Sequence, residues 1–464
     1  MQTLKPGALG LASAATLGVV MLSPAMTLYG NFGAAYATAG SAAPLAFVWA
    51  LFATLPTAAS YALLSRDRPE AGSAASWTAA FSTRAARWVG WIVFLYYVTN
   101  FVLQPVTLGL FFNDLLSAAG LVAGVGTYCL GALICCVLPA LIVYRGVHPS
   151  AEGALGFLLF EGVVVVALCL AVARAAPALD LRGFSAHASP GGGHGLFQAM
   201  IFALLSYCGF DVISTVAEET KLSRRLIPQA TFLALGLFGA LIIAGVWALT
   251  FAADPVRLKA MVDETNGMPI TAVARGLWGR GSILVMLTGI SAALGIAIAT
   301  SVGASRILFS MGRSGLAPRL FADLRNQVPH RAMHLVFGCG LAGAIVAGAL
   351  AGPYRAYLWW GATSTFFALI TFVFVNLANL ILNRQRAVAS AGGFLLYGLV
   401  PAAGIAVDLF LLWRSFLVEQ WGQGALGKSA IAFDLFCAVV ALGALFRSEA
   451  PEVAPEVAPE VAPA

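Results

Sequence analysis

The sequence predicts an all-α membrane protein with twelve transmembrane helices, and two observations lead to this fold class. Sixty per cent of the 464 residues are apolar and only 10 % are charged, which is more apolar than a soluble core of this size requires. Apolar runs of roughly 20 residues, the length that crosses a bilayer, recur along the chain between short polar loops. The chain is therefore predicted to form one membrane domain.

Each span is placed by its apolar run. The predicted spans are residues 8–36, 41–64, 88–113, 121–144, 152–174, 195–218, 229–253, 281–309, 332–351, 357–382, 391–414 and 427–446. The single membrane domain thus covers residues 1–446. Residues 447–464 repeat Pro-Glu-Val-Ala three times and are predicted to form a disordered cytoplasmic tail, because such a segment has nothing to bury.

The basic residues predict the orientation, because basic loops are retained on the cytoplasmic side. With the N-terminus inside, 17 of the 26 Lys and Arg residues fall in inner segments. We therefore expect a multi-pass protein of the cytoplasmic membrane with both termini in the cytoplasm. This topology accounts for the net charge of +6, and the basic residues are not interleaved with aromatics as a nucleic-acid surface requires. No nucleic-acid partner is predicted.

Cysteine and histidine, which often act in catalysis or bind metals in other proteins, do not cluster in this sequence. All seven cysteines lie in predicted spans without a CxxC pair, and the five histidines lie in loops or at span ends without metal-ligand spacing. We expect no catalytic residues, no metal site and no cofactor. The phosphate-binding motif GxxxxGK[ST] is absent too, which argues against a nucleotide-driven pump.

Two predicted spans contain signals that interrupt a helix. Ser23, Pro24, Ala25 and Met26 lie near the middle of span 1, where proline removes a backbone donor and disfavours helical geometry at the residue before it. Ser206-Tyr207-Cys208-Gly209-Phe210 lies near the middle of span 6. Two simpler interpretations remain open: a proline kink, and a glycine at a close helix contact.

The spacing of these signals favours interruptions that serve a site. Spans 1 and 6 begin two sets of five helices, about residues 8–174 and 195–382, and an odd number of spans inverts the second set. Spans 11 and 12, about residues 391–446, are then additional. Interrupted helices in corresponding places of two inverted halves are typical of a substrate site in secondary transporters.

Three stretches resemble the amino acid, polyamine and organocation (APC) superfamily and its amino acid permeases. They are GFDVISTVAEETKLSRRLIPQA (209–230), ASRILFSMGRSGLAP (304–318) and Pro69-Glu70-Ala71-Gly72-Ser73. The resemblance implies a five-plus-five inverted repeat with two extra helices. It also implies a secondary active transporter that moves a small amino acid or amine by alternating access, by proton coupling or exchange. A substrate sensor on the same fold and a channel are the alternatives, and the oligomeric state stays open.

One departure from the family bears on the substrate. Many members have a glycine-rich break in span 1, whose free N–H groups receive a substrate carboxylate. Here the matching stretch is Ser23-Pro24-Ala25, and proline offers no N–H. Whether the ligand has a carboxylate is therefore left open by the sequence.

The candidate substrate-binding residues follow from the two breaks, because interrupted helices present unpaired N–H and C=O groups. Two residues of span 3 at helical spacing are added, although these polar and aromatic side chains can equally serve packing. The set is Ser23, Ala25, Met26, Tyr97, Asn100, Ser206, Tyr207, Cys208, Gly209 and Phe210.

Glu161 lies midway along span 5 with only apolar neighbours in the sequence, and a charge inside a span costs about 2.5–3.5 kcal/mol. Some proton-coupled relatives carry a lysine in span 5, and this span has none, so we expect Glu161 to carry the coupling proton. The alternative is a fixed, neutral hydrogen-bond partner.

Four further charged residues are candidates for gating. Asp211 follows the break in span 6, Glu218 and Glu219 lie at the end of that span, and Arg306 lies at the end of span 8. They suit an inner gate. The sequence favours the simpler alternatives, a brace at the break for Asp211 and structural ion pairs for Glu218 and Glu219.

Overall fold

The computed structural model describes residues 9–175, 180–220, 223–252, 255–264, 268–422 and 424–443. The predicted tail, residues 447–464, lies outside the described residues.

The described chain is built almost entirely of helices. In the first half they are α1 (Leu11–Leu22), α2 (Pro24–Met26), α3 (Phe32–Ala39), α4 (Ala43–Asp67), α5 (Ala74–Ala79), α6 (Thr83–Ala118), α7 (Val125–Val143) and α8 (Val147–Ala175). In the second half they are α9 (Gly192–Tyr207), α10 (Val212–Thr215), α11 (Ser223–Ala252), α12 (Pro255–Glu264), α13 (Pro269–Trp278), α14 (Ile283–Arg313), α15 (His330–Ala351) and α16 (Pro353–Leu382). The last four are α17 (Arg384–Ala389), α18 (Ala391–Phe394), α19 (Val400–Leu411) and α20 (Ala425–Leu442).

Shorter helical segments complete these elements. Three are π-helical: η1 (Thr27–Asn31), η8 (Leu395–Leu399) and η9 (Leu412–Gln420). Six are single 3-10 turns: η2 (Gly40–Ala42), η3 (Arg182–Phe184), η4 (Ala186–Ala188), η5 (Ala217–Glu219), η6 (Gly279–Ser282) and η7 (Arg319–Ala322).

The prediction of an all-α membrane protein is confirmed. Among the described residues, 11 segments are long and apolar enough to cross a membrane. The first of them runs from Ser13 to Asp67 and covers most of the first predicted span and all of the second. Each of the other ten overlaps one predicted span.

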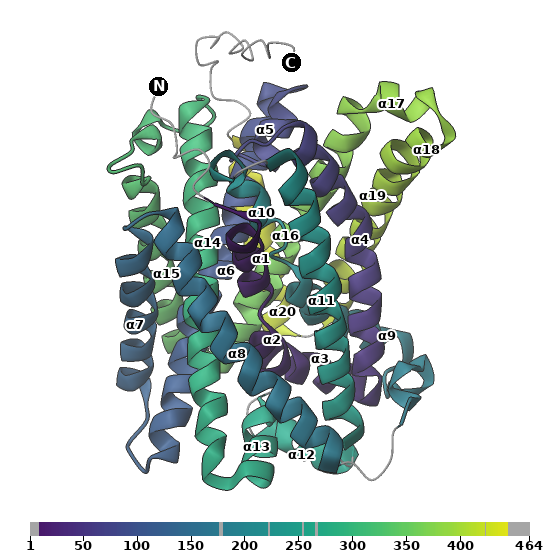
Figure 1. Ribbon diagram of the computed structural model, residues 1–464. Helices are drawn as coiled ribbons and strands as arrows, with labels where there is room; N and C mark the ends of the chain where they lie inside the picture. The colour runs from purple at the N-terminus through teal and green to yellow at the C-terminus, as the bar shows by residue number, and fades with distance from the viewer. Residues whose placement is uncertain are drawn as a thin grey trace.

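The helices form a bundle with an inner and an outer layer (Figure 1). The long helix α6 packs against α14 and α16, and α4 packs against α11 and α9. Outer helices carry exposed apolar side chains, such as Leu159 and Val163 of α8 and Leu350 of α15. Such a surface is stable against lipid, because the backbone groups of these helices are paired internally.

A buried polar network joins the eleventh predicted span to the rest of the bundle. The Asp408 carboxylate of α19 accepts hydrogen bonds from Thr57 of α4 (3.2 Å) and from the Asn376 amide of α16 (3.1 Å). The Ser60 hydroxyl of α4 donates to Asn376 Oδ1 (2.7 Å). All four side chains are at most 2 % exposed. The network therefore links α4, α16 and α19 through polar groups that are buried away from water.

Replacing Asp408 with alanine is expected to lower the free energy of unfolding by about 1–3 kcal/mol, because Thr57 and Asn376 lose a buried acceptor. Asp408→Asn keeps an oxygen in place and serves as the matched control, with a smaller loss. Thermal unfolding of the purified protein in detergent measures both. Equal melting temperatures for the two variants would contradict this role of the network.

Candidate functional site: two interrupted helices

The first predicted break is present, and its residues explain it. Helix α1 ends at Leu22, and Ser23 leaves helical geometry with φ 37° and ψ 107°. Helix α2 then begins at Pro24, whose fixed φ suits the first position of a helix. The Ser23 hydroxyl accepts from the Met26 N–H (3.1 Å), so the residue that breaks the helix also caps the next one.

The second predicted break is present as well. Helix α9 ends at Tyr207, the chain is non-helical from Cys208 to Asp211, and α10 begins at Val212. Gly209 has φ +130°, a backbone conformation that residues with a side chain rarely adopt. The conformational freedom of this glycine therefore allows the helix to break here, as its position in the sequence suggested.

The two breaks lie against each other. A Cβ atom added at Gly209 would lie 2.6 Å from Met21 Cγ and 3.2 Å from the Met21 carbonyl carbon, at the end of α1. One turn away, α1 packs on α10 through Gly18, whose position leaves no room for a Cβ beside Ile213. Small residues at both positions thus bring the two irregular backbones together.

The change Gly209→Ala is expected to lower stability by about 1–3 kcal/mol, because it adds both a strained φ and a clash with Met21. Gly162→Ala in the middle of α8 is the control, since no described atom lies within 4 Å of an added Cβ there. That variant should be unchanged, or more stable by up to about 1 kcal/mol. Melting temperatures in detergent measure both, and equal losses would contradict the close contact.

Glu161 reaches the break in span 1. Its Oε1 atom accepts from the Ser23 hydroxyl (2.6 Å) and from the Ala25 N–H (2.8 Å), and the residue is 1 % exposed. Helix α8 therefore places a carboxylate at the start of α2, where the partial positive charge of a helix end favours an anion. The structure brings the predicted residue Glu161 to two other predicted site residues, Ser23 and Ala25, which lie 138 and 136 positions away in the sequence.

Asp211 holds the break in span 6. Its carboxylate accepts from the hydroxyls of Tyr96 (3.0 Å) and Tyr97 (2.6 Å) of α6, and from the Gly209 N–H (3.2 Å). The predicted residue Tyr97 is thus joined to the break. Tyr96 was missed by the sequence analysis, although it stands beside Tyr97 in an otherwise apolar stretch.

A further polar contact across the breaks involves two residues that the sequence analysis missed. Asn31 of η1 donates from Nδ2 to the Ser206 hydroxyl (2.9 Å), and the Tyr357 hydroxyl of α16 donates to Asn31 Oδ1 (2.5 Å). Asn31 is the one asparagine of span 1. Its position two turns after Ser23 is the sequence feature that could have identified it as a site residue. The contact joins the second part of span 1 to span 6.

Three other predicted binding residues make contacts of a different kind. Asn100 bonds to Gln104 of its own helix, whose Nε2 donates to the Asn100 carbonyl oxygen (2.9 Å). Phe210 packs edge-on against the Tyr61 ring, with centroids 5.5 Å apart. Cys208 donates its N–H to Leu204 of α9 (3.0 Å). These three residues are placed for packing and for ending the helix.

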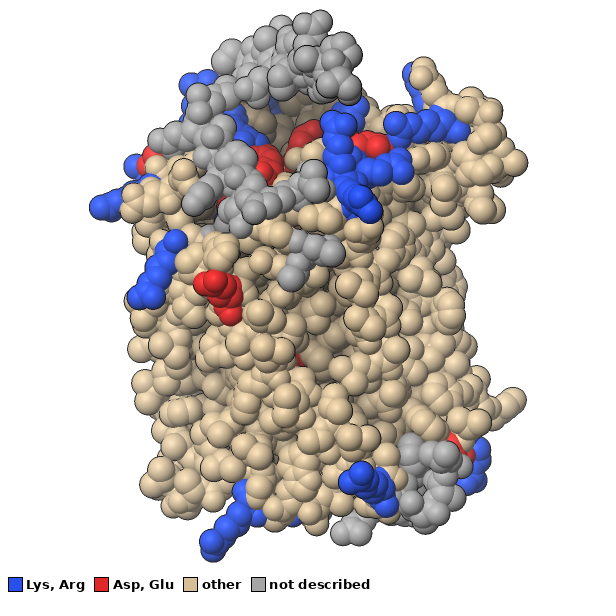
Figure 2. Space-filling view, in the orientation of Figure 1, with Lys and Arg blue, Asp and Glu red and all other residues tan. Residues whose placement is uncertain are grey.

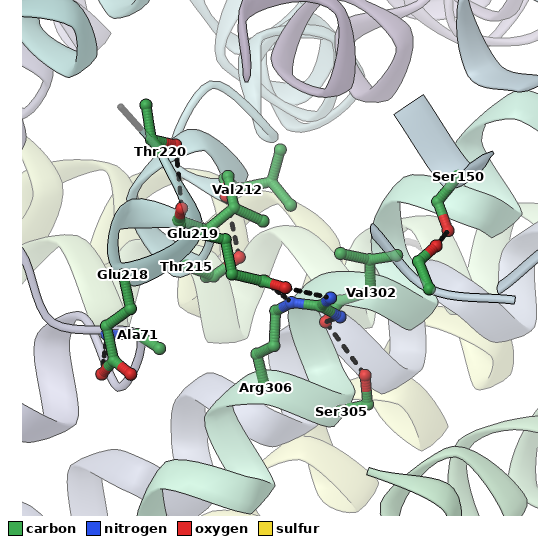
Figure 3. A network of polar contacts seen from close by, with 12 residues as sticks. Ala71, Ser150, Val212, Thr215, Glu218, Glu219, Thr220, Val302, Ser305 and Arg306 are labelled. Atoms are coloured by element: carbon green, nitrogen blue, oxygen red, sulfur yellow. Dashed lines mark hydrogen bonds and ion pairs between the residues drawn. The ribbon is translucent and has the colours of Figure 1, made fainter. Parts of the chain in front are cut away.

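Three of the four predicted gating residues, Glu218, Glu219 and Arg306, lie in a cluster of ion pairs (Figure 3), whereas Asp211 lies at the break of span 6. Arg306 of α14 donates from Nε to Glu219 Oε2 (2.5 Å) and from Nη2 to Oε1 (3.2 Å), and both side chains are 2 % exposed. Glu218 accepts from Arg313 Nη2 (2.6 Å) and from the Ala71 N–H (3.0 Å). The cluster connects η5, α14 and the loop before α5.

The start of the described chain is tied to the same cluster. The Leu9 N–H donates to the Glu219 carbonyl oxygen (2.9 Å), and Leu9 pairs with Thr220 in a parallel bridge. Glu219 therefore contacts Arg306 through its side chain and Leu9 through its backbone. Three separate segments therefore meet at this one residue.

A cavity of about 650 Å³ lies away from both breaks. It is bounded by α6, the loop after α14, and α20. Its lining includes Arg87, Trp91, Leu316 and Phe436, and none of its lining residues belongs to either break. We therefore do not assign it to the substrate.

Comparison with known proteins agrees with this architecture. A family model described as amino acid permease matches residues 10–444. The low-affinity putrescine importer PlaP of Escherichia coli (strain K12) is 26 % identical over 80 % of this chain and 79 % of its own length. The branched-chain amino acid permease BcaP of Lactococcus lactis subsp. cremoris (strain MG1363) is 24 % identical over 86 % of each chain.

A third relative is the methylthioribose transporter of Bacillus subtilis (strain 168), 26 % identical over 68 % of this chain and 69 % of its own length. All three names are those of permease-type transporters. With eleven described segments able to span a membrane, the chain is a multi-pass membrane protein of this type. It belongs to the amino acid permease family and, with it, to the APC superfamily.

Proposed function

We propose that this permease moves a small amino acid or amine across the cytoplasmic membrane by alternating access, coupled to protons through Glu161. The observation that carries the proposal is the contact of Glu161 with Ser23 and the Ala25 N–H at the break of span 1. A buried carboxyl group at that place can bind and release a proton. Because its charge changes when it does so, the electrostatics of the break change as well. The relatives named for putrescine and for branched-chain amino acids support the substrate range.

Alternating access needs elements that close each end in turn. The cluster of Arg306, Glu219, Glu218 and Arg313 is proposed as the closing element at the end that carries α5 and α10. Lys and Arg side chains gather near this end in Figure 2. By the positive-inside rule, we place it, and with it both termini, in the cytoplasm.

Flux through the purified protein in proteoliposomes tests this function. We expect saturable uptake of putrescine or of a neutral amino acid, stimulated by substrate trapped inside and driven uphill by an imposed pH gradient. A sensor would bind the same compounds without net flux. A channel would pass them without saturation and without stimulation by trapped substrate, so either result would replace the proposal.

A further inference from the structure

The backbone donors at the start of α2 are all used within the protein. Pro24 has no N–H, and the Ala25 N–H donates to Glu161 Oε1 (2.8 Å). The Met26 N–H donates to the Ser23 hydroxyl (3.1 Å), and the Thr27 N–H to the Ser23 carbonyl oxygen (3.1 Å). The first N–H groups of a helix are those that receive an anion. Here a protein carboxylate occupies the place that a substrate carboxylate would take.

The second break has the same character. The Gly209 N–H donates to Asp211 Oδ1 (3.2 Å), so a protein carboxylate also takes up this donor. Glu161 and Asp211 are 1 % and 2 % exposed. Their described hydrogen-bond partners are hydroxyl and N–H groups. Two buried carboxylates thus stand where the irregular backbones meet.

The described part of the chain gives neither carboxylate a basic partner. The buried guanidinium of Arg306 is already paired with Glu219. An unpaired buried carboxylate is costly, and a cation that pairs with it relieves that cost. The region of the breaks therefore favours a positively charged ligand and disfavours a second anion.

Two buried hydroxyls in the same region have no hydrogen-bond partner among the residues that the structure describes. Thr27 Oγ1 lies one turn beyond the break of span 1, and Tyr207 Oη belongs to the last residue before the break of span 6. Both residues are 0 % exposed. Buried hydroxyls are nearly always paired, so these oxygens are free acceptors for a polar ligand, and a hydroxyl oxygen accepts from an ammonium group.

We propose that the substrate is an organic amine that lacks a carboxylate, and that Glu161 determines this specificity by occupying the anion position of the broken helix. The ammonium group binds near Glu161, while the carboxylate of an amino acid would meet Glu161 and find no free backbone donor at the start of α2. Exclusion by an unpaired like charge is an effective way to reject a close analogue. This inference rests on the proposed transport function and narrows its substrate.

Matched pairs of compounds that differ only by the α-carboxylate test the inference: putrescine against ornithine, and isobutylamine against valine. Substrate-stimulated exchange in proteoliposomes is the assay, because it needs no ion gradient and therefore does not depend on the coupling role of Glu161. We expect each amine to be exchanged with an apparent affinity at least about tenfold higher than that of its amino acid, the effect of one charge-assisted contact.

Two substitutions separate charge from occupancy. Glu161→Gln keeps an acceptor for Ser23 and the Ala25 N–H but removes the charge, so amine affinity should fall about tenfold without a gain for amino acids. Glu161→Ala frees the Ala25 N–H, so valine or ornithine should gain exchange while the amines lose it. Glu152→Gln, on the exposed side of the same helix, is the control and should leave both preferences unchanged. Melting temperatures verify that each variant is folded.

The outcomes are distinguishable. Equal exchange of amines and amino acids by the unchanged protein overturns the inference and leaves the transport function standing. Failure of Glu161→Ala to gain amino acid exchange, in folded protein, overturns the assignment of Glu161 as the specificity residue. Absence of exchange for all four compounds overturns the proposed function and, with it, the inference.

Discussion

Replacing Glu161 with glutamine is expected to abolish uphill accumulation of substrate while exchange at saturating substrate continues. The amide is nearly isosteric and keeps the hydrogen bonds from Ser23 and the Ala25 N–H, but it cannot carry a proton. If one proton accompanies each substrate, an imposed gradient of about one pH unit supports about tenfold accumulation. The variant should reach a ratio of about one, because its transport is no longer linked to the gradient.

The measurement is the ratio of inside to outside substrate in proteoliposomes with and without a pH gradient. Glu152→Gln is the control, since Glu152 lies on the same helix with an exposed side chain that pairs with His148 (3.3 Å). This variant should accumulate substrate as the unchanged protein does. Accumulation by the Glu161→Gln variant with unchanged dependence on pH would contradict the proposed role of Glu161 in proton coupling.

Replacing Arg306 with alanine is expected to have the largest effect on stability, a loss of about 3–5 kcal/mol, because it leaves the Glu219 carboxylate buried without its partner. The two side chains are 2 % exposed and share two hydrogen bonds. The double variant Arg306→Met with Glu219→Leu removes both charges and should recover much of the loss. Chemical or thermal unfolding in detergent measures the three proteins.

Arg313→Ala is the matched control at the neighbouring pair. Arg313 and Glu218 are 26 % and 21 % exposed, and a partly solvated pair contributes at most about 1 kcal/mol. A loss for Arg313→Ala as large as that for Arg306→Ala would show that burial does not distinguish the pairs. A double variant as unstable as Arg306→Ala alone would show that packing, and not the unpaired charge, dominates.

Much of the fold could be read from the chain because the relevant signals are local. A run of about 20 apolar residues predicts a span wherever it occurs, and Pro24 predicts a break from its own chemistry. Gly209 was a weaker signal, since a glycine in a span equally marks a close helix contact. In the structure it is both, with φ +130° and no room beside Met21.

The candidate site was only partly accessible in this way. Ser23, Ala25 and Glu161 were each singled out, but for separate reasons, as part of a break and as a costly charge in a span. Their contact joins residues 136 positions apart. Asn31 and Tyr357 were missed because a single polar side chain in a span does not reveal which helix it faces.

The sequence by itself determined three things: that this protein is a membrane protein, which segments form its helices, and where two of those helices are interrupted. Hydropathy and backbone chemistry act over a few neighbouring residues, so local patterns are enough for these. Only the tertiary structure decided that Glu161 fills the donors at the start of α2 and that Arg306 pairs with Glu219. Those contacts depend on how whole helices pack, which no local pattern specifies.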